Sequence, residues 1–293
     1  MKNEKLLRLT LINIFFWVAF SHAFVDGHPA QSSAVYADEP AGLTINPDAE
    51  NNTAKRKNRV ELFASYEYLS PYDDYGDWKT LSAAFYRKER PDLTWFTQLG
   101  AFSRKEGSGL LAAAGAYKDW TESFYTYTSI SAGTDSTYLP QIRVDHAFNL
   151  KFGPGKKFVW VVGGAYIQYF NVYKDYILST GLIAYLGSWM AEYRVFRNQS
   201  QPGSIESFSH LFSLSYGQEG RQWTTASYSF GKQAYLATEL ATPEAVKNNS
   251  FLLTLKHRHW LANYYGVFGE LSYFELQSAY KKGGVLIGVF KEF

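Results

Sequence analysis

Acidic and basic side chains recur at alternate positions in several segments whose other alternate positions are apolar. In residues 60–69, Glu61 and Glu67 alternate with a row of valine, leucine, alanine and tyrosine side chains. Because neighbouring side chains of a β-strand point to opposite faces, this spacing separates a charged face from an apolar face. A charged face can bind a polar solute, select ions, or form internal ion pairs. The candidates for the lining of such a polar path are Glu61, Glu67, Arg143, Asp145, Glu192, Arg194, Lys256, Arg258 and Glu270.

The mixed signs of these charges limit the chemistry that they could perform. A set of one sign would indicate ion selection, and this set contains both signs. Two interpretations stay open: salt bridges that hold an interior open or fill it, and a path for a neutral or mildly charged polar chain. Aromatic rings on the same face could stack on sugar rings. The hydrophobic residues expected on that face are Phe63, Met190, Phe196, Phe268 and Phe274.

Catalysis requires a nucleophile and a base that can share a hydrogen bond, and the one adjacent serine–histidine pair of interest is Ser209–His210. Neighbours on a strand point to opposite faces, so these two side chains cannot act together. His146, His257 and His259 come with no sequence signature of a nucleophile and an orienting carboxylate. We therefore expect no catalytic residues.

Metal, cofactor and nucleic-acid binding find little support. His257 and His259 share a strand face and could both bind a metal, but no third ligand is close in sequence, and Trp260 beside them favours a membrane-interface position. The chain has no cysteine, which excludes thiolate metal sites and disulfides. It contains no glycine-rich nucleotide loop. A net charge of +2 argues against nucleic acid as a partner. We expect no metal and no cofactor.

The elements that must position the charged face are β-strands. From residue 59 onward, segments of about ten residues with alternating polarity follow one another between turn residues. The clearest is 141–150, in which Arg143 and Asp145 oppose an apolar row. Segments 123–132 and 176–186 alternate too weakly to assign a face. Aromatic residues make up 18% of the chain, which is typical of strands with one face in lipid; a soluble β-sandwich is the alternative.

Loop lengths provide a second test, because outer-membrane barrels alternate short periplasmic turns with longer outer loops. The turn residues of this chain follow that alternation. The expected outer loops are 71–77, 104–108, 133–136, 171–175, 197–206, 232–249 and 277–282. The expected inner turns are 89–92, 120–122, 153–157, 186–188, 217–221 and 261–265. The partition predicts an all-β, transmembrane, antiparallel up-and-down β-barrel of about 14 strands, with 12 or 16 as alternatives.

The ends of the strands agree with this architecture. Residues 284–293 predict a last strand that stops on Phe293, and such a strand must pair on both sides, with the first strand as its partner. A final aromatic residue is typical of bacterial outer-membrane barrels. Aromatic residues near other strand ends are expected at the lipid–water interface. They are Tyr72, Tyr75, Trp78, Trp120, Tyr138, Tyr173, Tyr176, Trp223, Trp260, Tyr264 and Tyr265.

The amino-terminal region predicts export from the cytoplasm. Basic residues precede an apolar run over 9–20, and Ser21-His22-Ala23 has small residues at the positions that a signal peptidase requires. The apolar run is shorter than the roughly 20 residues of a membrane-spanning helix. We expect a signal peptide over 1–23, with cleavage after Ala37 as an alternative, a disordered periplasmic lead-in over 24–58, and the barrel over 59–293.

Five stretches of the chain are similar to a known family: 75–81, 102–109, 115–120, 230–238 and 255–260. On these the chain resembles the YaiO family of Gram-negative outer-membrane barrels, over most of residues 58–293. The resemblance implies a single-chain protein of the bacterial cell outer membrane with no established catalytic set, and related barrels are associated with polysaccharide export. Some relatives have an amino-terminal helical repeat region for which this chain has no room. A periplasmic export partner is therefore expected to dock on the turns or on the lead-in.

The function expected from these features is a pore or export channel for a polar solute such as an exopolysaccharide. A closed structural or surface-binding barrel without transport is the alternative, and a lipid- or glycan-modifying enzyme is the third. The expected partners are outer-membrane lipid, the barrel-assembly machinery, a periplasmic export protein and polysaccharide, and not nucleic acid. Assembly machinery usually recognises an apolar residue two positions before the end, where this chain has Lys291.

The longest expected outer loop, 232–249, is more apolar than a freely solvated loop usually is. Burial of its apolar side chains would favour a position over the barrel mouth. We expect Lys232, Gln233 and Tyr235 to face the solute path there, with a loop that only covers the rim as an equal alternative.

Overall fold

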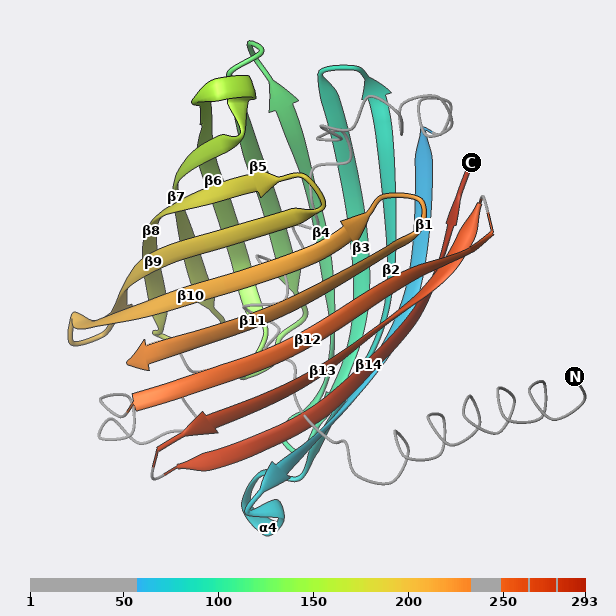
Figure 1. The fold of residues 1–293 in the computed structure, drawn as a ribbon. Helices are drawn as coiled ribbons and strands as arrows, with labels where there is room; N and C mark the ends of the chain where they lie inside the picture. Colours follow the sequence, from blue (N-terminus) through green and yellow to red (C-terminus); the bar gives the residue numbers. More distant parts are fainter. Residues whose placement is uncertain (1–56, 233–248, 263, 278) are drawn as a thin grey trace, which may run out of the picture.

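The chain folds into a single closed β-barrel, as a computed structural model shows (Figure 1). The structure describes residues 57–232, 249–262, 264–277 and 279–293. Fourteen strands in these ranges pair antiparallel, each with its neighbours in sequence, and β14 pairs with β1. The strands are β1(Asn58–Ser70), β2(Asp77–Arg90), β3(Leu93–Arg104), β4(Gly107–Asp119), β5(Phe124–Gly133), β6(Pro140–Phe152), β7(Phe158–Tyr169), β8(Lys174–Leu186), β9(Trp189–Gln201), β10(Ile205–Gln218), β11(Gln222–Lys232), β12(Asn249–Ala262), β13(Tyr265–Leu276) and β14(Tyr280–Glu292).

The two ends of the barrel differ in their connections. We call the end with turns 91–92, 120–123, 153–157, 187–188 and 219–221 the turn end, and the opposite end the loop end. The short helix α4(Tyr72–Tyr75) lies at the loop end, and the 3₁₀ helix η1(Pro154–Lys156) at the turn end. No helix in the described part of the chain is both long enough and apolar enough to span a membrane. The predicted closed antiparallel barrel is confirmed.

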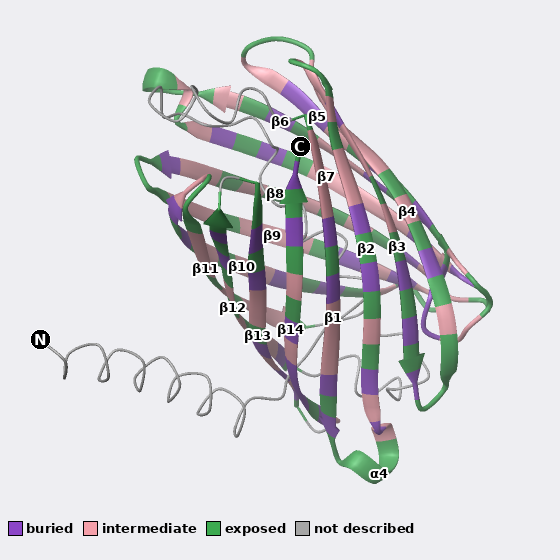
Figure 2. Cartoon of the chain, turned by 90° about the vertical axis from the view of Figure 1, so that its right-hand side faces the viewer, coloured by how far each residue is buried: buried purple, intermediate pink, exposed green. Residues whose placement is uncertain are grey.

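Barrel closure depends on the pairing of β14 with β1, which runs from Arg59↔Glu292 to Ser70↔Lys281. Alternate residues of these strands are buried and exposed, as Figure 2 shows. Leu62 and Val289 are exposed, whereas their neighbours Glu61 and Phe290 are buried. The alternation separates an apolar outer surface from an interior that contains charged side chains.

Most strands are longer than the sequence pattern predicts. The expected loops 104–108 and 197–206 are wrong in extent, because β3 continues to Arg104 and β9 continues to Gln201. Beyond the apolar band both faces of a strand meet polar surroundings, so alternation disappears while backbone pairing continues. Arg197 of β9 and Glu206 of β10 form an exposed ion pair of 2.6 Å in this extension. Sequence alternation therefore marks the apolar band and not the full strand.

Four hydrophobic clusters fill parts of the interior. Leu69, Trp78 and Phe274 belong to the largest cluster at the loop end, and Phe63, Phe268 and Phe290 belong to one at the turn end. Trp78, Tyr138 and Trp260 are buried in these clusters or in the one around Leu139, so their predicted interfacial position is wrong. A position near a strand end does not determine which face a residue occupies. The face is determined by whether the residue is an odd or an even number of positions from an inner residue of the same strand. The exposed aromatic residues near strand ends include Tyr72, Trp120, Tyr176, Tyr264 and Tyr265.

Candidate solute path inside the barrel

The structure places all nine candidate charges on the inner face of the barrel. Glu61, Glu67, Arg143, Asp145 and Arg258 are buried. Glu192, Arg194, Lys256 and Glu270 are half-buried and share the strand parity of buried inner residues. The remaining residues predicted for the path, Gln233 and Tyr235, lie outside the described residues, and Lys232 is the last residue of β11.

The inner charges form separate ion pairs. Arg143 lies 2.7 Å from Asp145, and Arg194 lies 2.6 Å from Glu192. Arg258 of β12 reaches across the barrel seam to Glu61 of β1 at 2.8 Å, and Arg59 contacts the same carboxylate at 2.9 Å. Lys256 lies directly opposite Glu270 in the β12–β13 register. Arg143–Asp145, Arg194–Glu192 and Lys256–Glu270 each set one cation against one carboxylate, whereas Glu61 meets two arginines.

A cation–aromatic cluster at the loop end contains residues that the sequence does not identify. The Arg104 guanidinium lies 3.5 Å from the Trp78 ring centroid and 4.2 Å from the Tyr138 ring centroid. The Lys282 ammonium lies 4.3 Å from the same Trp78 ring. Arg104 and Lys282 are buried although both fall in segments predicted as loops. Arg104 is an even number of positions from the buried Phe102, and Lys282 from the buried Leu286, so each lies on the inner face of its strand. This spacing is the sequence signal that could have identified both residues.

The loop between β5 and β6 folds into the barrel at this cluster. Tyr138 donates a hydrogen bond from its hydroxyl group to the Gly107 carbonyl oxygen at 3.0 Å, and Leu139 is fully buried. Arg104 and Phe102 pack against Tyr138 from β3. A loop that connects two strands thereby closes part of the loop-end mouth.

Three of the five inner hydrophobic residues named above pack into clusters instead of facing open space. Phe63, Phe268 and Phe274 are buried, and the Phe63 and Phe268 ring centroids lie 6.0 Å apart. The expectation that these rings offer stacking surface to a sugar is therefore wrong for these three. Their faces are covered by neighbouring rings and by the Arg258 guanidinium, whose Cζ lies 5.1 Å from the Phe268 centroid. Met190 and Phe196 are half-buried.

Strands β10 to β12 present small hydroxyl side chains to the interior, which we call the hydroxyl wall. Its members are Ser207, Ser209, Ser213, Ser215, Thr225, Ser227, Ser229, Ser250 and Thr254. Hydrogen bonds join Ser215 to Thr225 at 2.8 Å and Ser227 to Thr254. Five members are half-buried, so they border accessible space: Ser213, Thr225, Ser227, Ser229 and Thr254. Serine at positions 207, 209, 213 and 215, on one strand face with Leu211 between the two pairs, is the sequence signal of this wall.

A family model described as the YaiO membrane beta barrel domain matches residues 57–236, which is more than half of the chain. The chain belongs to the YaiO family. No curated protein matches it. YaiO membership and the closed barrel place the protein in the bacterial outer membrane. In such barrels the short turns face the periplasm, so the loop end of this YaiO-family barrel faces outward.

Solved structures are similar to the YaiO-family barrel at low sequence identity. The CymD monoaromatic hydrocarbon channel has a TM-score of 0.58 and 10% identity, covering 92% of this chain and 94% of that chain. A bacterial polysaccharide outer membrane secretin has a TM-score of 0.49 and 9% identity, covering 81% of this chain and 99% of that chain. An anion-selective porin from Comamonas acidovorans has a TM-score of 0.45 and 10% identity, covering 80% of this chain and 98% of that chain. The likeness to CymD shows the fold alone.

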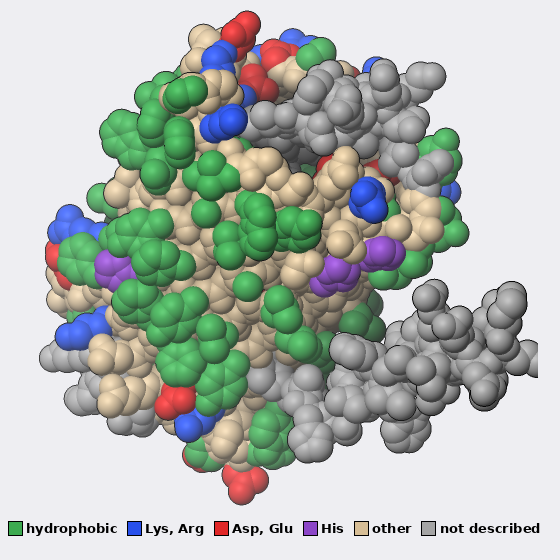
Figure 3. Space-filling model, in the orientation of Figure 1, with side chains coloured by type: hydrophobic (Ala, Val, Ile, Leu, Met, Phe, Trp, Pro, Cys, Tyr) green, Lys and Arg blue, Asp and Glu red, His purple; other side chains and the backbone are tan. Residues whose placement is uncertain are grey.

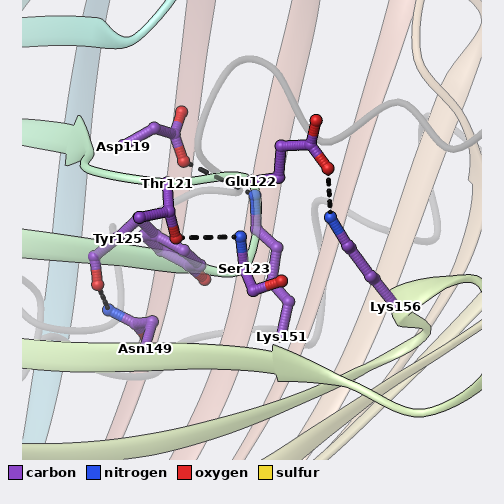
Figure 4. A network of polar contacts seen from close by, with 8 residues as sticks. All are labelled: Asp119, Thr121, Glu122, Ser123, Tyr125, Asn149, Lys151 and Lys156. Carbon is purple, nitrogen blue, oxygen red and sulfur yellow. Dashed lines mark hydrogen bonds and ion pairs between the residues drawn. The ribbon is translucent and has the colours of Figure 1, made fainter.

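Polar contacts fasten the periplasmic turns of this YaiO-family barrel to one another (Figure 4). Lys156 of η1 contacts Glu122 of the β4–β5 turn at 2.7 Å, and Lys151 contacts Asp119 at 3.4 Å. The hydrogen bond from Lys156 lowers the pKa of the Glu122 carboxyl group below its usual value. These contacts tie two successive turns together at the periplasmic rim.

The histidines among the described residues lie on the outer surface of this YaiO-family barrel, as the space-filling view shows for one face (Figure 3). His146 hydrogen-bonds Thr128 at 2.8 Å, and His257 hydrogen-bonds Thr224 at 2.8 Å. His210 contacts the Phe230 ring on the outer face, whereas Ser209 is buried inside. Ser209 and His210 therefore point to opposite faces. Among the described residues, no group of three or more histidine, cysteine, aspartate or glutamate residues could hold a metal ion.

Proposed function

We propose that this YaiO-family barrel is an outer-membrane channel for a polar solute, with an exopolysaccharide as the solute class suggested by the family resemblance. The five half-buried members of the hydroxyl wall support this function most directly. Hydroxyl groups both donate and accept hydrogen bonds, so a row of them can hold a polar chain weakly at successive positions. Weak, repeated binding is what conduction requires.

A closed barrel without transport is the second candidate, and it rests on the buried clusters at both ends. Trp78 and Phe274 fill part of the loop end, and Phe63 and Phe290 fill part of the turn end. An enzyme is the weakest candidate, because Ser209 and His210 occupy opposite faces. A periplasmic export partner, if it binds, would meet the charged turns around Glu122 and Lys156.

Single-channel recording in planar bilayers tests the channel. Purified barrel, shown to be folded by heat-modifiable migration on gels, should give steady conductance. Absence of conductance from the folded protein would favour the closed barrel without transport. Deletion of residues 234–245, with the ends joined by a short Gly-Ser link, should raise the conductance if that loop narrows the mouth. Unchanged conductance in a folded deletion variant would remove the loop from the path.

A further inference from the structure

The inner surface changes character between β12 and β13. One row of inner residues runs across the strands in register, through Glu192, Ser213, Ser227, Thr254 and Ser272. The first four are half-buried, and Ser272 is buried. Chemically similar hydroxyl groups in one row thus differ in access, and the difference starts where the row leaves the hydroxyl wall.

Large side chains account for the loss of access beyond Thr254. We call the inner side chains of β13, β14, β1 and β2 the packed seam. Those that are buried are Phe268, Ser272, Phe274, Leu276, Tyr280, Lys282, Leu286, Phe290, Glu292, Glu61, Phe63, Glu67, Leu69, Trp78, Ser82 and Ala84. Rings and long cationic chains occupy the space in front of these strands, so a solute cannot pass there without unpacking them.

The hydroxyl wall differs from the packed seam in the size of its side chains, and five of its nine members are half-buried. Its side chains are short and uncharged, and each hydroxyl group offers one donor and two acceptor sites. Pairs such as Ser215–Thr225 use only part of this capacity. The charges at its borders are compensated, with Arg194 2.6 Å from Glu192 on one side and Lys256 opposite Glu270 on the other.

The wall also has a continuation toward the periplasm. Trp223 is an inner residue of β11, half-buried, and packs at the edge of the turn-end cluster. A partly accessible indole ring can stack on an apolar face of a sugar ring. Phe196 of β9 is half-buried on the other border of the wall. Hydrogen-bonding groups with flanking ring faces are suited to polyhydroxylated solutes.

We propose that the solute path is eccentric: it follows the hydroxyl wall of β10 to β12, and it favours uncharged, hydroxyl-bearing solutes over ions of either sign. This inference rests on the proposed channel function. The packed seam is a fixed filling of the barrel and takes no part in passage.

Single cysteines locate the path, because the chain has no cysteine of its own. Ser213→Cys and Ser229→Cys place a thiol on the wall, and Ser272→Cys and Ser82→Cys place the same thiol in the seam. A cationic methanethiosulfonate reagent should label the two wall thiols in the folded protein and lower the single-channel conductance by at least about half. The seam thiols should react only after unfolding. The reagent should therefore leave the conductance of the two folded seam variants unchanged.

The outcomes distinguish a failure of the proposed path from a failure of the proposed channel function. Conductance that survives wall labelling, or that falls on labelling of Ser272→Cys, would overturn the eccentric path and leave the channel in place. An absence of conductance in all four folded variants and in the parent would overturn the channel function, and the path with it.

Selectivity provides the second measurement. In a potassium chloride gradient the parent channel should show little preference between cation and anion, and liposomes should take up neutral malto-oligosaccharides faster than anionic oligosaccharides of similar size. Glu192→Gln leaves Arg194 without its carboxylate partner and should shift the reversal potential toward anion preference. Strong ion selectivity of the parent, or faster uptake of the charged sugars, would contradict the preference for uncharged solutes.

Discussion

The packed seam and the hydroxyl wall share one backbone geometry and differ in side-chain size. In the seam, the Trp78 ring contacts the Arg104 and Lys282 cations, and the Phe268 and Phe290 rings contact Arg258 of β12. On the wall, Ser213 and Ser227 have short side chains and are half-buried. The comparison shows that the interior of one closed barrel can be filled in front of some strands and accessible in front of others. The seam also joins the first and last strands, which no turn connects, so side-chain packing must hold that junction.

Removal of the Glu61 carboxylate should have the largest effect on the seam. Glu61→Ala leaves the buried Arg258 guanidinium without its 2.8 Å partner. A buried charge stripped of its partner costs about 3–5 kcal/mol, so the urea unfolding midpoint in detergent should fall sharply. Glu192→Ala is the matched control, because its pair with Arg194 is less deeply buried than Glu61 and Arg258 and should contribute less. Equal shifts for both variants would contradict the division into seam and wall.

Overpacking of the seam should have the next largest effect. A Cβ atom at Gly288 would lie 2.3 Å from the Phe268 ring, inside the van der Waals contact distance. Gly288→Ala should therefore destabilise the barrel by about 1–3 kcal/mol, measured by the temperature of the heat-modifiable transition. The double variant with Phe268→Leu should recover part of this loss. If it does not, the clash is not the cause.

Changes on the wall should affect stability less. Ser227→Ala removes a hydrogen bond with Thr254 from a half-buried site, and its cost should stay below about 1.5 kcal/mol. The same unfolding assay checks this value, and Thr254→Val should not add to it, because both variants remove one contact. A cost as large as that of Glu61→Ala would mean that the wall is as tightly packed as the seam.

Substitution in the exposed periplasmic turns should have the smallest effect on the stability of the barrel. Lys156 lowers the pKa of Glu122, so their contact stabilises the folded state above the unperturbed carboxyl pKa and is lost as the pH falls through the lowered value. Lys156→Ala should return the Glu122 pKa to its usual value in an NMR titration. The unfolding midpoint should not change measurably, because the pair is exposed. A midpoint shift comparable to that of Gly288→Ala would show that the turns hold the barrel together.

The access of each inner side chain was not predictable from the sequence. Alternation places Ser227 and Ser272 on the same face with equal justification, yet one is half-buried and the other buried. Their surroundings come from strands far away in sequence: the seam brings β1 and β2 against β13 and β14. For the same reason no local pattern encodes the contact of Lys282 on β14 with Trp78 on β2 in the loop-end cluster.

The sequence by itself determined the class of structure, a strand number of about 14 with 12 or 16 as alternatives, and the face of each strongly alternating residue. These properties are local, because the period-2 geometry of a strand and the alternation of turns and loops are written in neighbouring residues. The tertiary structure alone decided strand lengths beyond the apolar band, as at Arg104, and the inward burial of Trp78, Tyr138 and Trp260. It also decided which inner side chains remain accessible, since access depends on the volume of residues that meet only when the barrel closes.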